Sequence, residues 1–190
     1  PDYTPPPFPI DADFTYNQGR IVAYPDGSGD NSSYAHSIRQ AGAGGWMGLN
    51  NPLNLHFPVA GPSQSGNRAE LSATIGIIKT LPTQPLLIRQ DSQWALEGLM
   101  ALRQVLPPDP LADHTDLWNI TAQLLTARPS HATVDFEKVK SHTTEQHVLQ
   151  GYYANKHGHR TPVTASSKEG NVGADGLAKE GVLLHPPAAA

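Results

Sequence analysis

Cysteine is absent from this chain of 190 residues, which excludes a disulfide framework, a zinc ribbon and thiol catalysis. No stretch approaches 18 consecutive apolar residues, so the sequence predicts neither a membrane-spanning helix nor a membrane partner. The N-terminal segment lacks the basic start and apolar run of a secretory signal peptide, and we expect an intracellular protein. A strong positive charge is also missing. With a net charge of −4, a nucleic-acid partner would have to be held by a local patch or by metal ions.

Charged residues make up only 16% of the chain, whereas proline and glycine number 18 and 17. Because neither residue suits the interior of a helix or strand, this excess predicts long tails and loops. We expect a proline-rich leader over residues 1–19, one domain over 20–182 and a tail over 183–190. Within the domain, the polar segment 143–170 predicts a long loop. We expect the protein to be a monomer.

The spacing of apolar residues predicts a mixed α/β domain. Short segments with β-rich alternation come first, and helical spacing then alternates with buried strands. The predicted elements are strands at 20–24, 41–49 and 53–60, a helix at 70–81, a strand at 86–88, helices at 92–105 and 113–126, a strand at 134–139 and a helix at 171–182. Three antiparallel strands followed by alternating helices and strands indicate a mixed sheet with helices packed on it.

Four carboxylates lie at the ends of these predicted elements. Asp26 ends the first strand, Glu70 begins the first helix, Asp91 follows the buried strand and Asp175 begins the last helix. Open α/β sheets place their sites at such positions, and clustered carboxylates repel one another unless cations neutralise them. Oxygen ligands suit Mg²⁺ or Mn²⁺, and two such ions could hold the attacking and leaving oxygens of a phosphodiester. Each acid by itself is more simply explained as an ordinary turn or helix-cap residue.

Six short segments, found in the same order, resemble those of the ribonuclease H family. They are Tyr24–Gly29, Asn67–Leu71, Arg89–Trp94, Asp116–Trp118, Lys138–His142 and Gly170–Ala178. The resemblance covers about residues 20–182. It implies the ribonuclease H fold, with a five-stranded mixed sheet of three antiparallel and then two parallel strands, flanked by helices. It also implies cleavage of the RNA strand of RNA–DNA hybrids, leaving 5′-phosphate ends.

The same resemblance implies roles for individual residues. The four acids would hold two Mg²⁺ ions, for which Mn²⁺ can substitute, and His142 would assist proton transfer or product release. An imidazole titrates near neutral pH and suits that work, although His142 also fits an exposed loop histidine. The hydroxyl group that distinguishes RNA from DNA would be read by residues near the acids. The implied nucleic-acid contacts are Gly27, Ser28, Ser65, Asn67, Gln93 and Asn171.

The chain departs from the family pattern at several places. Pro25 and Gln90 stand where threonine usually precedes the first and third acids, and about residues 30–40 are an insertion. The basic protrusion of some family members is missing, since residues 104–137 contain a single Lys or Arg, Arg128. Five of the 13 Lys and Arg fall within residues 138–168. We hypothesise that the segment 143–170 partly replaces the protrusion; the simpler reading is a disordered surface insertion.

Two other functions stay open at this point. Pro25, Gln90 and the low basic charge favour a weakly active or inactive module that binds hybrids or proteins, whereas the four retained acids argue against it. A resolvase or integrase of the same superfold would also use two metal ions, but Asn67 and Gln93 argue against that reading. Ribonuclease H domains of this style occur in retroelement polyproteins, so the resemblance also allows a larger polyprotein with a neighbouring reverse transcriptase.

Overall fold

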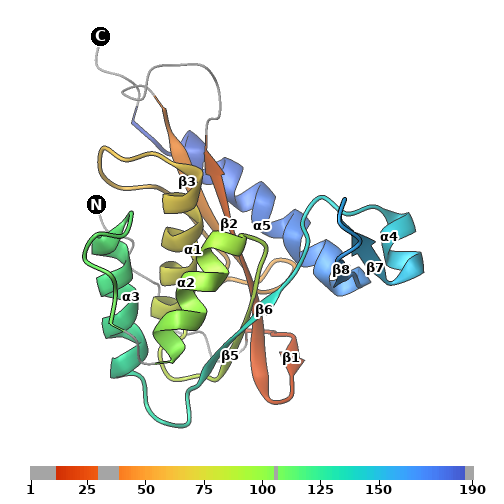
Figure 1. Ribbon diagram of the computed structural model, residues 1–190, viewed down its shortest axis with the longest axis horizontal. Coiled ribbons are helices and arrows are strands. Elements are labelled where there is room, and N and C mark those ends of the chain that lie inside the picture. The colour runs from red at the N-terminus through yellow and green to blue at the C-terminus, as the bar shows by residue number, and fades with distance from the viewer. Residues whose placement is uncertain (1–11, 30–38, 105–106, 187–190) are drawn as a thin grey trace.

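The computed structural model describes residues 12–29, 39–104 and 107–186, which form a mixed sheet covered by helices on both faces (Figure 1). The central path of the sheet runs β4-β3-β2-β5-β6. Its strands are β2 (Arg20–Gly29), β3 (Ala41–Trp46), β4 (Leu55–Pro58), β5 (Leu86–Gln90) and β6 (Val134–Lys138). β3 pairs antiparallel with β2 and β4, while β5 pairs parallel with β2 and β6. The expected mixed sheet is therefore confirmed, and a short sixth strand, β1 (Tyr16–Asn17), also pairs with β2.

Alternation along β2 decides which helix packs on which face. Ile21 and Ala23 join the core beneath α1 (Gly66–Thr80), whereas Val22 and Tyr24 contact Ala174 of α5 on the opposite face. Such alternation is the geometry of a strand buried on both sides. The helices α2 (Gln93–Arg103) and α3 (Thr115–Ala127) pack with α1, and α5 (Ala165–Leu183) covers the other face alone.

Part of the expected leader is folded against the body. The short strand β1 (Tyr16–Asn17) pairs antiparallel with the start of β2, and Phe14 packs on the main core. Gln18 and Gly19 make the connecting turn, with φ angles of 50° and 77°. Two positive φ angles are typical of the type I′ turn that suits a tight hairpin. Residues 1–11 lie outside the described residues, as do residues 30–38, most of the predicted insertion.

The prediction of a long loop over residues 143–170 is wrong. This segment contains α4 (Glu145–Gln150), β7 (Tyr152–Ala154) and β8 (Arg160–Pro162), and α5 begins at Ala165 instead of near Asn171. We call residues 143–164 the lobe; it projects from the body beside the first turns of α5 (Figure 1). Its elements could not be predicted from apolar spacing, because they are stabilised by local capping interactions and not by an apolar stripe. Thr144 and Thr164 each form a capping box.

None of the helices in the described ranges combines the length and apolarity needed to cross a membrane.

Candidate active site

The register of the two parallel strands places Asp26 and Asp91 at one edge of the sheet. β2 and β5 pair from Ile21 and Leu86 to Ala23 and Ile88. Asp26 and Asp91 each lie three residues beyond the last paired residue of their strand. The two acids are therefore at the same height along the sheet. In open α/β sheets, this carboxyl edge is where ligands bind.

Two glycines bring the other two acids to Asp26. A Cβ atom on Gly27 would lie 2.6 Å from the backbone nitrogen of Glu70, so only glycine lets α1 approach β2 this closely. Gly44 is the partner of Asp26 across the β2–β3 ladder, and a Cβ atom there would meet the α5 backbone at Ala174 and Ala178. The close approach of α5 places Asp175 beside the same edge.

Asp26 and Glu70 form a half-buried acidic pair. Burial, together with the charges of Asp175 and Asp91, raises the pKa of Asp26 to about 6, against the lowering effect of the hydrogen bond with Glu70. The Gly27 N–H also donates to Asp26 Oδ1 at 2.9 Å. Burial, followed by the charge of Asp26, raises the pKa of Glu70 well above its usual value. A carboxyl pair in such surroundings retains a proton unless a cation neutralises it.

Asp91 and Asp175 are held by other partners. Ser141 donates to Asp91 twice, from its backbone nitrogen at 3.0 Å and from its hydroxyl at 2.6 Å, and the Lys138 ammonium donates to the Asp91 carbonyl. Asp175 forms an ion pair with Lys179 at 2.8 Å. Consequently no three His, Asp or Glu side chains in the described residues are arranged as a ready metal cluster.

The chemistry of the four acids nevertheless fits a divalent cation. Glu70 Oε2 is buried and has no hydrogen-bond partner in the described residues, which is costly for a carboxylate oxygen. All the donors are carboxylate oxygens, the ligands that Mg²⁺ and Mn²⁺ prefer. A cation beside Asp26 and Glu70 would give Glu70 Oε2 a partner and would also neutralise the repulsion between the two carboxylates.

Comparison with known proteins agrees with this arrangement. The sequence model of the RNase H family matches residues 18–183. The chain belongs to the RNase H family. It is 32% identical over 136 residues to ribonuclease H of Schizosaccharomyces pombe, covering 66% of this chain and 48% of that protein. The chain thus aligns with about half the length of this curated relative.

Solved RNase H structures share the fold. The solution structure of the PFV RNase H domain matches with a TM-score of 0.59 and 20% identity, over 86% of this chain and 94% of that domain. A foamy viral protease-reverse transcriptase in complex with an RNA/DNA hybrid matches with a TM-score of 0.58 and 16% identity, over 93% of this chain and 22% of that one. At these identities the likeness concerns the fold alone.

His142 lies at the same edge as the acids of this RNase H chain. It directly follows Ser141, the partner of Asp91, and its side chain is exposed. Its φ of 54° is in the left-handed region, which is uncommon for a residue with a side chain. The contact of the Ser141 backbone with Asp91 therefore fixes the backbone of His142, while the His142 imidazole stays accessible to a substrate.

The expected nucleic-acid contacts fall into two groups. Gly27 and Ser28 are half-buried on β2, and Asn67 and Gln93 are exposed in the first turns of α1 and α2. Ser65 caps α1, because its hydroxyl accepts from the Arg68 N–H at 3.1 Å, and it also lies 3.3 Å from His114 Nε2.

Asn171 does not join these contacts. It is only 6% exposed, and its amide donates to the Lys140 carbonyl at 3.2 Å. The side chain ties α5 to the segment just after β6, and its burial argues against the predicted contact with nucleic acid. The sequence placed Asn171 at the edge of a loop, whereas the earlier start of α5 puts it inside a helix.

Gln90 and Ser141 are the residues near the site that sequence reasoning missed. The buried Gln90 amide donates to Thr74 Oγ1 at 3.1 Å, and its oxygen accepts from the Ser92 N–H at 3.2 Å. It thereby joins α1 to the turn that carries Asp91. Ser141 stands within a segment used for the resemblance, but its contact with Asp91 spans 50 residues and leaves no local signal.

Pro25 does not interrupt the strand that carries Asp26. β2 runs unbroken to Gly29, and Pro25 pairs with Gly45 of β3. The ladder between β2 and β5 has already ended at Ala23, so the missing N–H of Pro25 falls where β2 has parted from β5. A proline is tolerated at such a position because no partner strand depends on its N–H.

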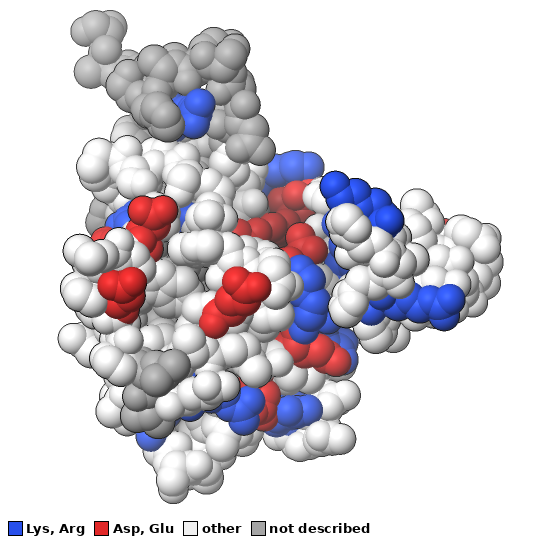
Figure 2. All heavy atoms as spheres, viewed as in Figure 1, with Lys and Arg blue, Asp and Glu red and all other residues white. Residues whose placement is uncertain are grey.

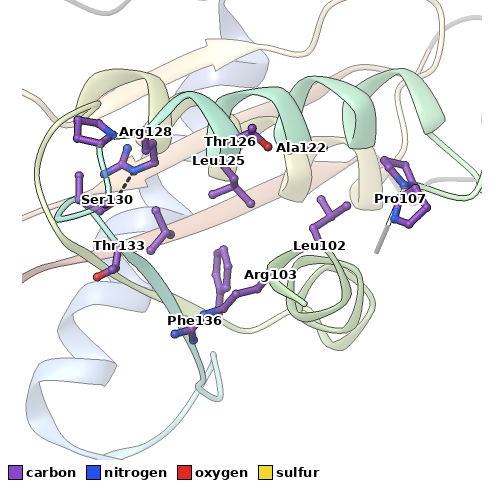
Figure 3. Close-up of a pocket in the computed structure, with 14 residues that line it drawn as sticks. Leu102, Arg103, Pro107, Ala122, Leu125, Thr126, Arg128, Ser130, Thr133 and Phe136 are labelled. Atoms are coloured by element: carbon purple, nitrogen blue, oxygen red, sulfur yellow. Dashed lines mark hydrogen bonds between the residues drawn. The ribbon is translucent and has the colours of Figure 1, made fainter. Parts of the chain in front are cut away.

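A large cavity lies away from the acids. It measures about 510 Å³ and opens between α2, α3 and the start of β6, with Leu102, Leu125 and Phe136 among its lining residues (Figure 3). No carboxylate lines it. Arg128 on its wall donates to the backbone carbonyls of Leu81 at 2.7 Å and Ala132 at 2.8 Å. The one cation of residues 104–137 is therefore used to hold the end of α1.

Proposed function

We propose that this chain is a metal-dependent endonuclease that hydrolyses the RNA strand of RNA–DNA hybrids and leaves 5′-phosphate ends. The observation that carries the proposal is the half-buried Asp26–Glu70 pair with raised pKa values, with Asp91 and Asp175 at the same edge of the sheet. Membership of the RNase H family supports the choice of substrate.

The four acids would hold two Mg²⁺ ions, for which Mn²⁺ can substitute. When bound, the ions supply an activated water and neutralise charge at the leaving 3′ oxygen. With cations bound, Asp26 and Glu70 would both be ionised. The exposed His142 imidazole transfers a proton near the scissile phosphate or assists product release.

Substrate selection rests on groups around this edge. The backbone and side chains of Gly27, Ser28, Asn67 and Gln93 lie on elements next to the acids and suit recognition of a 2′-hydroxyl. Ser65 would contact a phosphate of the DNA strand. A reverse transcriptase neighbouring this domain in a larger polyprotein would supply the hybrid, as the likeness to foamy viral protease-reverse transcriptase suggests.

A binding module without strong activity is the second candidate. The pairing of Asp91 with Ser141 and of Asp175 with Lys179 favours it, because both carboxylates have other partners. In that case the chain would bind hybrids and leave them intact.

Cleavage of a labelled RNA–DNA hybrid separates the two candidates. With Mg²⁺ or Mn²⁺ we expect cutting of the RNA strand alone, no cutting of duplex RNA or duplex DNA, and a loss of more than about 100-fold in Asp26→Asn. Asp113→Asn, which changes an exposed carboxylate outside the site, serves as the matched control. Intact hybrid binding without any cutting by the unmodified protein would establish the binding module instead.

A further inference from the structure

The lobe and the residues that flank it carry a positive charge that the rest of the molecule lacks. Residues 138–168 contain five Lys and Arg and one carboxylate, whereas the remaining chain contains eight Lys and Arg and sixteen carboxylates. Figure 2 shows Lys and Arg side chains on the lobe and along its junction with the body, beside a recess where carboxylates gather. An acidic protein that binds a polyanion needs a local patch of this kind.

Most of these cations are available to a ligand. Lys168 pairs with the lobe's single carboxylate, Glu145, at 2.8 Å. In the described part of the chain, no ion pair involves Lys140, Lys156 or Arg160. Lys156 and Arg160 are exposed.

Aromatic rings hold two of the cations in place. The Arg160 guanidinium lies over the Tyr152 ring at 4.2 Å, and the Lys140 ammonium lies over the Tyr153 ring at 5.2 Å. A guanidinium stacked on a ring keeps its N–H donors free for phosphate oxygens and loses less entropy when it binds them. Tyrosine beside arginine is also a common surface for nucleic acid.

The tip of the lobe is equally ordered. The Asn155 side chain accepts from the N–H groups of His157 and His159, both at 2.9 Å, and Gly158 turns the chain with a φ of 78°. Lys156 therefore stands on a folded turn. At the other end, Val163 is buried and its N–H donates to the Gly151 carbonyl at 3.0 Å, which closes the lobe on itself.

The patch is continuous with the candidate active site. Lys138 and Ser141 contact Asp91, and Lys140 between them reaches Tyr153 of the lobe. A duplex lying on the acids would meet these cations next. We propose that the lobe, through Lys156 and Arg160, and the adjoining Lys140 bind the sugar-phosphate backbone of the hybrid beyond the cleavage site. This inference rests on the proposed function, since it takes the same substrate.

The test measures binding of a labelled RNA–DNA hybrid as a function of salt, in the Asp26→Asn background so that the hybrid stays intact. We expect the double variant Lys156→Ala/Arg160→Ala to bind about tenfold more weakly. We also expect the slope of log K against log salt to become shallower by about 1.8, since about 0.9 is lost per phosphate contact. Arg160→Lys keeps the charge and should keep most of the slope.

Matched controls make the result specific. Lys79→Ala removes a lysine from the last turn of α1 and should leave both the affinity and the slope unchanged. The melting temperature of each variant checks folding, and Lys156→Ala alone serves if the double variant does not fold. An affinity and slope equal to those of the parent would overturn the proposal and would turn attention to an acidic protein partner.

The outcome is independent of whether the proposed activity holds. If the unmodified protein fails to cut the hybrid but the lobe variants lose affinity, the lobe proposal stands and the endonuclease proposal fails. If the unmodified protein cuts and the lobe variants bind as tightly as their parent, the reverse conclusion follows.

Discussion

A single hydroxyl group sets the orientation of one acid in this molecule. Ser141 Oγ donates to Asp91 Oδ2 at 2.6 Å, and its backbone nitrogen holds the other oxygen at 3.0 Å. Hydrogen bonds to a charged group are the stronger ones. Ser141 is a positioning residue, because it acts on the substrate only through Asp91.

Ser141→Ala removes the hydroxyl and leaves the backbone contact. We expect single-turnover cleavage to fall about 5- to 20-fold at low Mg²⁺, because the free carboxylate samples more orientations and binds the cation less well. A higher Mg²⁺ concentration should recover most of the rate. Ser141→Thr should keep the rate, while Ser130→Ala on an exposed turn is the control. An unchanged Mg²⁺ dependence in Ser141→Ala would refute the positioning role.

At the scale of elements, close packing of helices on the sheet brings the acids together. Gly27 lets α1 approach β2, and Gly44 lets α5 approach β3. α5 also contacts β2 and β4, so a shift of this helix moves Asp175 relative to Asp26. The geometry of the site thus depends on two interfaces between layers.

Gly44→Ala should push α5 away from the sheet. The added methyl group meets backbone at Ala174 and Ala178, which cannot yield as a side chain can, so we expect a loss of about 1–3 kcal/mol in the free energy of unfolding. Cleavage should fall by more than hybrid binding does. Gly176→Ala on the same helix has no neighbour within 4 Å and should gain up to about 1 kcal/mol. Urea denaturation measures both; equal stability of the two variants would contradict this account.

At the scale of the whole molecule, the acids link folding to pH and to cations. The pKa of Asp26 is about 6 in the folded protein, against an ordinary value of 3.8. Between these values the folded state binds more protons than the unfolded state, so stability falls as pH rises. The stabilisation of the folded state by Asp26 is complete below about pH 4 and is lost as the pH rises through about 6. Glu70, whose pKa is also raised, acts in the same direction.

We therefore expect the free energy of unfolding without divalent ions to fall by on the order of 2 kcal/mol between pH 5 and pH 7. Asp26→Asn should remove most of that fall and be the more stable protein at pH 7. Millimolar Mg²⁺ should raise the melting temperature at pH 7 and much less at pH 5, because protons compete with it for the carboxylates. Thermal unfolding scans measure these effects, and a stability that rises over this range in EDTA would rule out the account.

The candidate site could be predicted from short motifs, whereas much of its support could not. Asp26, Glu70, Asp91 and Asp175 lie on short segments that occur in the order found in the RNase H family. Short apolar runs indicate the strands β2 and β5. The supporting roles of Gln90 and Ser141 could not be predicted, because their partners are distant in sequence. Asn171 was misjudged because its burial depends on where α5 begins.

By itself, the sequence determined the mixed sheet, the order of its main strands and the identity of the acids, because apolar periodicity and motifs are local properties of a chain. Only the tertiary structure decided how those acids are held and what the segment after His142 becomes. The lobe is built from polar caps and a short hairpin, which leave no periodic apolar signal. Its cations meet the active edge because Lys140, which follows β6, lies over Tyr153 of the lobe and Lys168 of α5 pairs with Glu145. Such contacts depend on packing that no local pattern records.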